Sequence, residues 1–229
     1  MAIVKKYKAE VVKIHNPFDT IYTIEFKSVS GTFRYLPGQF LHLALEEYDP
    51  SSGWPDSRCF SMQTSPSNET LKITFAVKGN FTKRMANELK VGKVIDIKLP
   101  YGELFQQEHS KSDVVFIAGG TGITPYLSVF CYPSFSEYSN PILYFGIRNS
   151  TYNIYHNELS KAIEINPYLK IQIVDQERDG ILNIESIRDK HGLNATYFIS
   201  GPQPMIASFK EKLLTKGVPI GNIKTDDWE

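Results

Sequence analysis

The second half of the chain opens on the segment Val114-Val115-Phe116-Ile117-Ala118-Gly119-Gly120-Thr121-Gly122-Ile123-Thr124-Pro125. The apolar run predicts a buried strand, the glycines predict a tight turn, and Pro125 suits the first turn of a helix. Glycines there let backbone N–H groups approach an anion, to which the start of a helix adds partial positive charge. This arrangement at the first strand of an α/β domain is where dinucleotides bind. The pattern also fits a tight turn without a ligand, and its spacing is not G-x-G-x-x-G.

The sequence beyond this segment alternates between short apolar runs and helical stretches. The further apolar runs cover residues 142–145, 171–174 and 197–199. Helices are expected near residues 126–130, 155–165, 184–189 and 205–216. Apolar runs without alternation are typical of parallel strands covered on both faces by helices. We therefore predict a doubly wound parallel α/β domain over residues 109–229.

The first half of the chain has a different pattern. Short segments rich in β-branched and aromatic residues, in rough alternation, predict strands near residues 7–15, 21–28, 39–45, 71–77 and 94–99. One helix is expected over residues 81–89, where Phe81, Met85 and Leu89 recur at a spacing of four. This pattern predicts an antiparallel β-barrel of the six-stranded type over residues 1–108. The boundary is expected in the polar stretch 106–112.

Composition narrows the class of function. The chain has 229 residues, of which 41% are hydrophobic and 22% charged, as in ordinary globular proteins. No run of 18 apolar residues and no N-terminal targeting pattern occurs, so we expect a cytoplasmic protein without a membrane span. Cys59 and Cys131 are too few for an iron–sulfur cluster or a metal site, and any redox cofactor must be organic. The zero formal net charge argues against nucleic-acid binding.

Seven short motifs, taken together and in order, resemble the ferredoxin-NADP reductase superfamily, which joins a flavin-binding barrel to a nicotinamide-binding α/β domain. The motifs are Pro37-Gly38-Gln39-Phe40, Arg58-Cys59-Phe60-Ser61, Val77-Lys78-Gly79-Asn80-Phe81-Thr82, Leu99-Pro100-Tyr101-Gly102, the segment from Gly119 to Pro125, Tyr144-Phe145-Gly146-Ile147-Arg148 and Gly201-Pro202-Gln203-Pro204-Met205. The resemblance covers nearly the whole chain. It implies that residues 1–108 bind FAD and residues 109–229 bind NADH or NADPH.

The resemblance assigns the Arg58-Cys59-Phe60-Ser61 motif to the flavin. Arg58 offers a permanent charge and a planar fork of donors for a pyrophosphate oxygen. Phe60 points to the same face as Arg58 in a strand. It stands where the family usually has a tyrosine that stacks on the flavin, so the stacking area is kept and one hydroxyl is lost. Ser61 resembles the hydroxyl residue that hydrogen-bonds near flavin N5, which makes it a candidate catalytic residue. Cys59 belongs to the same cofactor-binding motif.

A second flavin segment precedes and opens the helix of the barrel domain. Its candidate binding residues are Val77, Lys78, Gly79, Phe81 and Thr82. Free N–H groups and the Thr82 hydroxyl are suited to the flavin pyrophosphate, although Thr82 also suits simple N-capping of the helix. A dinucleotide flavin needs this second phosphate site, so the segment favours FAD over FMN.

The resemblance places the nicotinamide dinucleotide on three segments of the α/β domain. The candidate binding residues are Gly119, Gly120, Thr121, Gly122, Thr124, Pro125, Arg148, Gly201, Pro202 and Met205. Arg148 follows a strand end and is expected to meet the adenosine ribose or its phosphate, with a simple surface arginine as the alternative. Many family members carry a cysteine before the Gly-Pro turn, whereas this chain has Ser200.

The chain ends on an acidic-x-aromatic sequence that also resembles the family. Asp226 is expected to approach the reacting centre, where it orients the nicotinamide or relays a proton, and is the second candidate catalytic residue. Trp228 is expected to bind the cofactor by covering the flavin face, with packing against the barrel as the alternative. Fraying of the terminus is the competing interpretation.

The implied activity is hydride transfer from NADH or NADPH to FAD, followed by release of electrons to a separate ferredoxin, flavodoxin or oxygenase component. Reduction of free flavin is the alternative, and a non-catalytic flavin-binding subunit is a further one. In the segment from Val174 to Asp179, Arg178 is accompanied by three acidic residues that would repel a 2′-phosphate, so the charges slightly favour NADH. The oligomeric state is left open.

Overall fold

The computed structural model describes residues 3–18 and 20–225, and the chain divides into two compact units between Glu103 and Leu104. This division falls earlier than the polar stretch in which the sequence placed the boundary. Leu104 is buried in the core of the second unit, and the ring of Phe105 stacks on that of Phe198 with centroids 4.7 Å apart. These two apolar residues therefore belong with the second unit.

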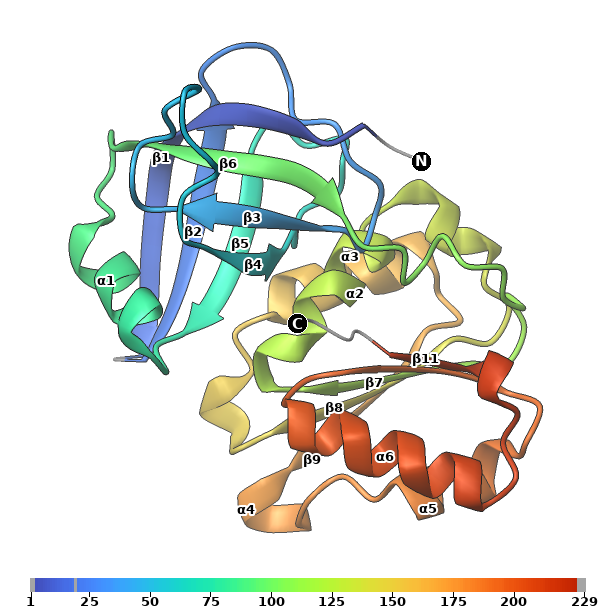
Figure 1. The fold of residues 1–229 in the computed structure, drawn as a ribbon. Coiled ribbons are helices and arrows are strands. Elements are labelled where there is room, and N and C mark those ends of the chain that lie inside the picture. Colours follow the sequence, from blue (N-terminus) through green and yellow to red (C-terminus); the bar gives the residue numbers. More distant parts are fainter. Residues whose placement is uncertain (1–2, 19, 226–229) are drawn as a thin grey trace. The chain divides into compact units, whose positions relative to one another are not determined.

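The first unit is a near-closed antiparallel barrel of six strands in the order β4-β3-β6-β1-β2-β5 (Figure 1). The strands are β1 Lys5–Phe18, β2 Ile21–Ser28, β3 Phe40–Ala44, β4 Ser57–Ser61, β5 Leu71–Ala76 and β6 Val94–Tyr101. The two outer strands approach each other just beyond β4, where the N–H of Gln63 donates to the carbonyl of Lys72 at 2.8 Å. The predicted barrel is confirmed.

The barrel encloses an apolar core because alternate strand residues point inward. On β3, Leu41 and Leu43 are fully buried, whereas His42 between them is only half-buried. The single helix of this unit, α1 (Asn80–Glu88), packs on the barrel through Phe81 and Met85, and Leu89 follows it into the core. The spacing of four seen in the sequence marks the buried face of this helix.

The second unit is a five-stranded parallel sheet with the order β11-β10-β7-β8-β9. The strands are β7 Val114–Gly119, β8 Ile142–Ile147, β9 Lys170–Asp175, β10 Thr196–Ser200 and β11 Ile223–Thr225. The chain starts at the central strand, moves out to β9, and then crosses to β10 on the other side of β7. Strand order therefore reverses at β7, and ligands bind outside the carboxyl ends of the strands at such a point.

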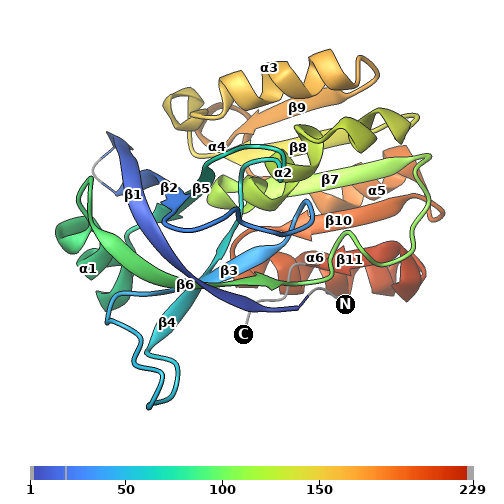
Figure 2. The ribbon, with the colours of Figure 1, turned by 90° about the horizontal axis from the view of Figure 1, so that it is seen from above.

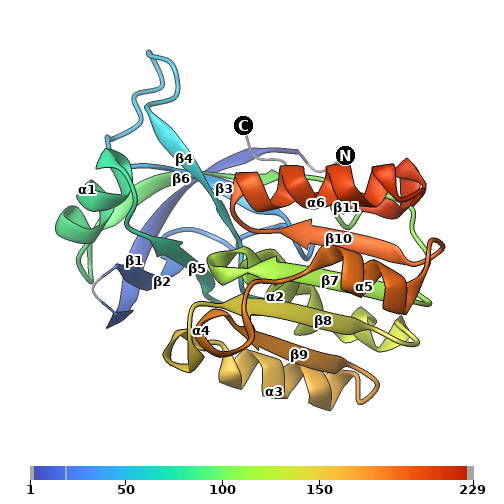
Figure 3. The ribbon, with the colours of Figure 1, turned by 90° about the horizontal axis from the view of Figure 1, so that it is seen from below.

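Helices cover both faces of this sheet, as the doubly wound prediction requires. Helices α2 (Thr124–Phe130) and α3 (His156–Ile165) lie on one face, and α5 (Ile184–His191) and α6 (Gln203–Thr215) lie on the other (Figures 2 and 3). Shorter elements are η1 Gly120–Ile123, η2 Pro133–Glu137, η3 Ser150–Tyr152, α4 Gln176–Asp179 and η4 Ile220–Asn222. In the part of the chain that the structure describes, no helix has the length and apolar character needed to cross a bilayer.

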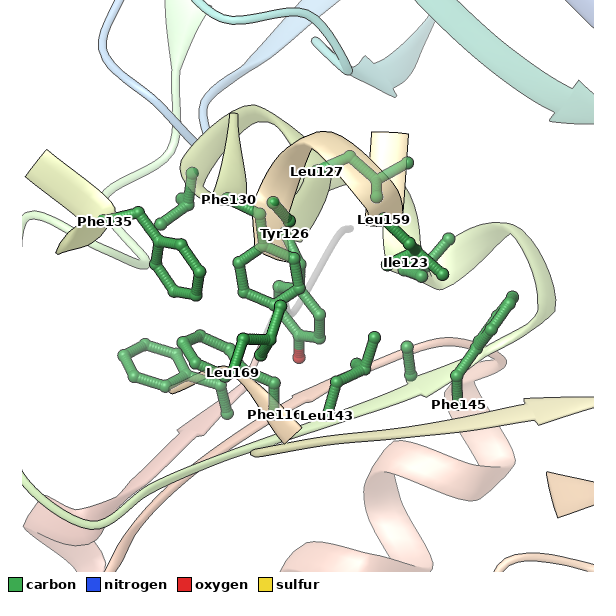
Figure 4. Packing of buried hydrophobic residues seen from close by; sticks show 14 of the residues in the cluster. Phe116, Ile123, Tyr126, Leu127, Phe130, Phe135, Leu143, Phe145, Leu159 and Leu169 are labelled. Atoms are coloured by element: carbon green, nitrogen blue, oxygen red, sulfur yellow. The ribbon is translucent and has the colours of Figure 1, made fainter. Parts of the chain in front are cut away.

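Two hydrophobic clusters explain the apolar runs of the sequence. Phe116 of β7 packs with Tyr126 and Phe130 of α2 on one face of the sheet (Figure 4). The neighbouring residues Val115 and Ile117 belong to the cluster on the opposite face, beneath α5 and α6. Every residue of such a strand is buried, because both faces are covered.

Candidate functional site

The first part of the candidate site lies at the carboxyl ends of β7 and β10, where the strand order reverses. The two strands are hydrogen-bonded neighbours, with Ala118 opposite Ser200 in the register. Gly119 ends β7 and leads into the 3₁₀ turn η1, while Gly201 and Pro202 follow β10 and lead into α6. Two segments predicted from distant parts of the sequence are therefore brought to one edge of the sheet.

The two turns pack backbone against backbone. A Cβ on Gly122 would lie 2.5 Å from the Gly201 Cα, 2.6 Å from the Gly201 nitrogen and 2.6 Å from the Ser200 carbonyl oxygen. A Cβ on Gly201, whose φ is +155°, would lie 2.7 Å from the Met205 Cε and 3.1 Å from the Gly119 nitrogen. The missing side chains are what allow this approach. The close packing explains the glycines at positions 122 and 201.

Gly120 faces open space. It has a φ of +56°, and a Cβ built on it would meet no atom within 4 Å. The turn then closes on itself, because the Thr124 hydroxyl donates to the Thr121 carbonyl at 2.9 Å. Helix α2 begins at Thr124 with Pro125 in its first turn, and all seven of its residues are buried. The turn therefore exposes the backbone of Gly120 and continues directly into the buried helix α2. This arrangement suits a ligand that approaches the main chain closely.

The carboxyl ends of β8 and β9 carry the charged residues of this edge. The guanidinium of Arg148 is exposed and lies 5.5 Å from the centroid of the Tyr152 ring. Asp175 is buried and caps α4, where its Oδ1 accepts from the N–H groups of Glu177 and Arg178 at 3.1 and 3.4 Å. The amide of Asn149 donates to Glu177 at 3.0 Å.

Arg178 is engaged by its own neighbour. Its Nε and Nη2 both donate to the Asp179 carboxylate at 2.8 Å. This pair lowers the pKa of Asp179 to about 2, through the hydrogen bonds from Arg178 and from the backbone N–H of Asp175. Arg178 is thus paired with an acidic neighbour, whereas the guanidinium of Arg148 lies over an aromatic ring.

The second part of the candidate site belongs to the first unit, where β4 meets α1. The guanidinium carbon of Arg58 lies 5.1 Å from the centroid of the Phe81 ring. Arg58 is half-exposed and pairs with the exposed Asp56 at 2.6 Å. Phe60 packs edge to face on Phe75, with ring centroids 5.9 Å apart. Arg58 and Phe81, which come from two separate motifs, are therefore in contact.

The start of α1 shows what Thr82 does within the chain. Its hydroxyl oxygen accepts from the N–H groups of Lys78 and Gly79 at 3.0 and 3.1 Å, and the hydroxyl donates to the Gly79 carbonyl at 3.1 Å. Thr82 is therefore the third residue of the helix and not its N-cap, which is Gly79, and its hydroxyl holds the turn that precedes the helix. The first helical hydrogen bond runs from Lys83 to Gly79, so the helical N–H groups of residues 80–82 have no partner within the helix.

The remaining predicted residues are placed as follows. Ser61 ends β4 opposite Phe40 of β3, and the Val77 N–H donates to the Thr20 carbonyl at 2.7 Å. Cys59 lies on the other face of β4 from Arg58 and Phe60, and its sulfur contacts His42. Asp226 and Trp228 lie outside the described residues.

Sequence reasoning missed several polar residues of the barrel. The amide of buried Gln39 donates to the Gly102 carbonyl at 3.0 Å and links two of the family motifs. Buried Gln63 accepts from the Thr74 hydroxyl at 2.6 Å and helps to join the open edges of the barrel. His42 is the third, because it faces Cys59 across β3 and β4. Gln39 is part of a motif but was assigned no role from the sequence. Gln63 and His42 lie beside or in strands where apolar residues are usual, and that position was the signal that could have found them.

Both parts of the site fit the groups that the resemblance implies. The guanidinium of Arg58, which is half-exposed and paired with Asp56, and the N–H groups of residues 80–82, which have no i−4 partner within the helix, suit a pyrophosphate. Gly79 offers room beside them, because a Cβ there would meet no atom within 4 Å. In the second unit, the open face of Gly120 allows a dinucleotide to reach the main chain at the strand ends.

Comparisons with known proteins agree with this geometry. Residues 116–211 match the family model of the oxidoreductase NAD-binding domain. The chain is 26% identical over 236 residues to a flavohemoprotein of Rhizobium meliloti (strain 1021), which covers 93% of this chain and 58% of that protein. It is 28% identical over 231 residues to the ferredoxin–NAD(P)(+) reductase component of the naphthalene 1,2-dioxygenase/salicylate 5-hydroxylase systems of Ralstonia sp., covering 96% of this chain and 68% of that protein.

A solved structure shows the same fold over nearly the whole length. Ferredoxin-NADP⁺ reductase from Plasmodium falciparum superposes with a TM-score of 0.77 at 18% identity, covering 97% of this chain and 96% of that chain. The barrel and the parallel sheet agree with this likeness in fold. The chain has the two-domain fold seen in ferredoxin-NADP⁺ reductase, and over nearly its whole length it is similar in sequence to flavohemoproteins and to ferredoxin–NAD(P)(+) reductase components.

Proposed function

We propose that the chain takes a hydride from a nicotinamide dinucleotide onto FAD and passes the electrons to a separate acceptor. The observation that carries this proposal is the packing of the Gly122 turn against Gly201 at the carboxyl ends of β7 and β10. That packing leaves bare backbone at the point where the strand order reverses, which is where α/β sheets bind dinucleotides. In this proposal, residues 1–108 hold the flavin and residues 109–229 hold the nicotinamide dinucleotide.

The residues of the second unit bind and orient the nicotinamide dinucleotide. The backbone of Gly119, Gly120 and Thr121 approaches the phosphates, and the Gly201-Pro202 turn with Met205 forms the opposite wall. Thr124 and Pro125 hold the turn on α2. Arg148, whose guanidinium is exposed, meets the ribose or its phosphate.

The residues of the first unit bind the flavin. Arg58 donates to the pyrophosphate, and its contact with the Phe81 ring fixes its direction. Lys78, Gly79 and Thr82 form the second phosphate contact, in which the Thr82 hydroxyl shapes the turn and backbone N–H groups face the anion. Phe60 supplies apolar area for the ring system, and Ser61 a hydroxyl beside it. Bound FAD supplies the chemistry itself, which is two-electron uptake and one-electron release.

The acceptor in this proposal is a separate carrier protein, such as a ferredoxin, a flavodoxin or an oxygenase component. Among the relatives are component C of a methane monooxygenase and the reductase component of the naphthalene 1,2-dioxygenase/salicylate 5-hydroxylase systems. The chain spans 43% and 68% of the length of these two relatives. The proposal of a separate acceptor rests on the names of these relatives and on the ability of a reduced flavin to release electrons one at a time.

Of the two nicotinamide dinucleotides, NADH is proposed as the preferred donor. Asp175, Glu177 and Asp179 lie at the end of β9 and in α4, and Arg178 is held by Asp179. A 2′-phosphate would bring negative charge to a place where three carboxylates face Arg148, with Arg178 already paired. NADH carries no such charge and avoids the repulsion.

Retention of the flavin tests the first unit's part of the proposal. The purified chain is expected to stay yellow through gel filtration, and the flavin released on denaturation is expected to be FAD, because two anion contacts hold a dinucleotide flavin. The measurement is the absorbance of the protein peak with chromatographic identification of the released flavin. A colourless chain that oxidises NADH only when FMN or riboflavin is added would instead identify a free-flavin reductase.

A further inference from the structure

The guanidinium of Arg58, which we propose to bind a phosphate of FAD, is in contact with a carboxylate of the chain itself. Its Nη1 donates to Oδ1 of Asp56 at 2.6 Å. Carboxylates and phosphates are the anions that arginine binds through the same planar fork of donors. Asp56 therefore occupies a donor that a phosphate oxygen would use.

Two other contacts hold Arg58 in place without Asp56. Nη1 also donates to the carbonyl of Ser57 at 2.8 Å, and the guanidinium carbon lies 5.1 Å from the centroid of the Phe81 ring. Both partners belong to regular elements, since Ser57 begins β4 and Phe81 is buried on α1. Loss of the Asp56 carboxylate would thus remove a negative charge and leave the direction of the guanidinium to these two contacts.

The Asp56 side chain can leave Arg58 at little cost. It is 66% exposed, and it lies in the connection between β3 and β4, one residue before β4 begins. Within residues 3–18 and 20–225, Arg58 is the one hydrogen-bond partner of its carboxylate. An exposed ion pair contributes little, because water solvates both charges once the pair opens. The carboxylate is therefore held loosely enough for a ligand to displace it.

We infer that Asp56 sets how tightly the chain holds FAD, because its carboxylate competes with a FAD phosphate for the guanidinium of Arg58. Without a ligand, the two side chains neutralise each other. A phosphate that binds Arg58 must displace the carboxylate into water or share the guanidinium with it, which brings two like charges together. Asp56 weakens FAD binding in either case. This role of Asp56 rests on the proposed function, in which Arg58 holds the pyrophosphate.

The competition has a signature in the dependence of FAD binding on salt. In the unmutated chain the phosphate meets an ion pair without net charge, whereas in Asp56→Asn it meets a cation. Salt screens the attraction between exposed charges, and the Debye length falls to about 3 Å at about 1 M salt. The affinity of Asp56→Asn for FAD is therefore expected to fall more steeply with salt than the affinity of the unmutated chain.

The FAD affinity of Asp56→Asn tests the competition. Asparagine keeps the shape and an oxygen that accepts from Arg58, so the substitution removes the charge alone. The flavin-loaded chain is diluted in steps, and the fluorescence of the released FAD gives the dissociation constant. At low salt we expect Asp56→Asn to lower this constant about fivefold, the upper range for an exposed ion pair. At about 1 M salt the difference is expected to fall below about twofold.

Asp49→Asn is the matched control. Asp49 is exposed in the same connection between β3 and β4, but its carboxylate accepts from the N–H and the hydroxyl of Ser51, both at 2.8 Å. Its replacement removes the same charge from the same loop without touching Arg58. We expect the dissociation constant for FAD to stay that of the unmutated chain. A gain of affinity that the two variants share would show a general effect of negative charge and would overturn the inference.

An unchanged or raised dissociation constant in Asp56→Asn also overturns the inference, and a raised one would show that Asp56 instead orients Arg58. Arg58→Gln separates this failure from that of the proposed function. If Arg58→Gln weakens FAD binding and Asp56→Asn does not strengthen it, the competition alone is wrong. If neither substitution changes FAD binding, Arg58 is not part of the flavin site.

A chain that binds no FAD contradicts the proposed function, and inorganic pyrophosphate then decides on Asp56. Its binding needs the guanidinium of Arg58 but no flavin, and isothermal titration calorimetry measures it directly. Pyrophosphate is expected to bind Asp56→Asn more tightly than the unmutated chain or Asp49→Asn. Equal binding to all three chains would contradict the competition.

Discussion

Replacing Gly122 with alanine is expected to reduce NADH-dependent flavin reduction by about 100-fold, the effect of a displacement near 1 Å in a positioning element. The new Cβ would lie 2.5 to 2.6 Å from three backbone atoms of Ser200 and Gly201, and backbone cannot move aside as a flexible side chain can. The turn must therefore separate from the end of β10. The measurement is the rate of reduction of bound flavin at several NADH concentrations, together with the melting temperature.

Gly221→Ala is the matched control. It makes the same change in the same unit at a glycine where a Cβ would meet no atom within 4 Å. Its rate is expected to equal that of the unmutated chain. Overpacking at Gly122 is also expected to lower the free energy of unfolding by about 1 to 3 kcal/mol. A folded Gly122→Ala chain with undiminished affinity for NADH and undiminished rate would show that this turn does not bind the dinucleotide.

Replacing Arg58 with glutamine is expected to raise the dissociation constant for FAD by about 10- to 100-fold, as for loss of a hydrogen bond to a charged group. The guanidinium is held over the Phe81 ring at the start of α1, and its fork of donors remains half-exposed. Glutamine keeps polarity but loses both the charge and the stacking. The measurement is fluorescence titration of the flavin-free chain with FAD.

Arg84→Gln supplies the comparison for Arg58. Arg84 lies on α1 in the same unit and is similarly exposed, but it is paired with two carboxylates, those of Glu46 and Glu88, both at 2.7 Å, whereas Arg58 is paired with Asp56. Its replacement is expected to leave FAD affinity unchanged, because an exposed ion pair contributes little. Equal losses of FAD affinity in Arg58→Gln and Arg84→Gln would indicate that FAD responds to the positive charge of this unit in general and not to Arg58 in particular. No loss in Arg58→Gln would remove Arg58 from the flavin site.

The fold could be predicted because the two halves bury their strands differently. The β7 segment is apolar at every position since helices cover both faces of the sheet, whereas β3 alternates between inward leucines and an outward histidine. Two elements gave no comparable signal. Strand β11 has three residues at the sheet edge, and α4 is a single turn that Asp175 caps. Strand β11 depends on its pairing with β10, and α4 depends on the cap that one side chain supplies. Hydrophobic periodicity along the sequence reveals neither.

The candidate site could be predicted only in part, for the same physical reason. Glycine content marked the Gly119 turn but left a ligand-free turn open, and its partner Gly201 is distant in sequence. The contact that makes Gly122 necessary exists only once β7 and β10 are paired. His42 and Cys59 needed the register of β3 and β4, and the Arg58–Phe81 contact needed α1 to pack on the barrel. Motif order identified Arg58, Cys59, Phe81, Gly122 and Gly201 without showing which residues they touch, and it did not identify His42.

Anaerobic stopped-flow mixing of the flavin-loaded chain with NADH is the most direct test that it transfers a hydride from a nicotinamide dinucleotide to FAD. The flavin absorbance is expected to bleach in a single turnover, and more slowly with NADPH at the same concentration because of the carboxylates at the end of β9 and in α4. Addition of a one-electron acceptor such as ferricyanide is expected to restore the absorbance. A flavin that stays oxidised with both nucleotides would contradict the proposed activity.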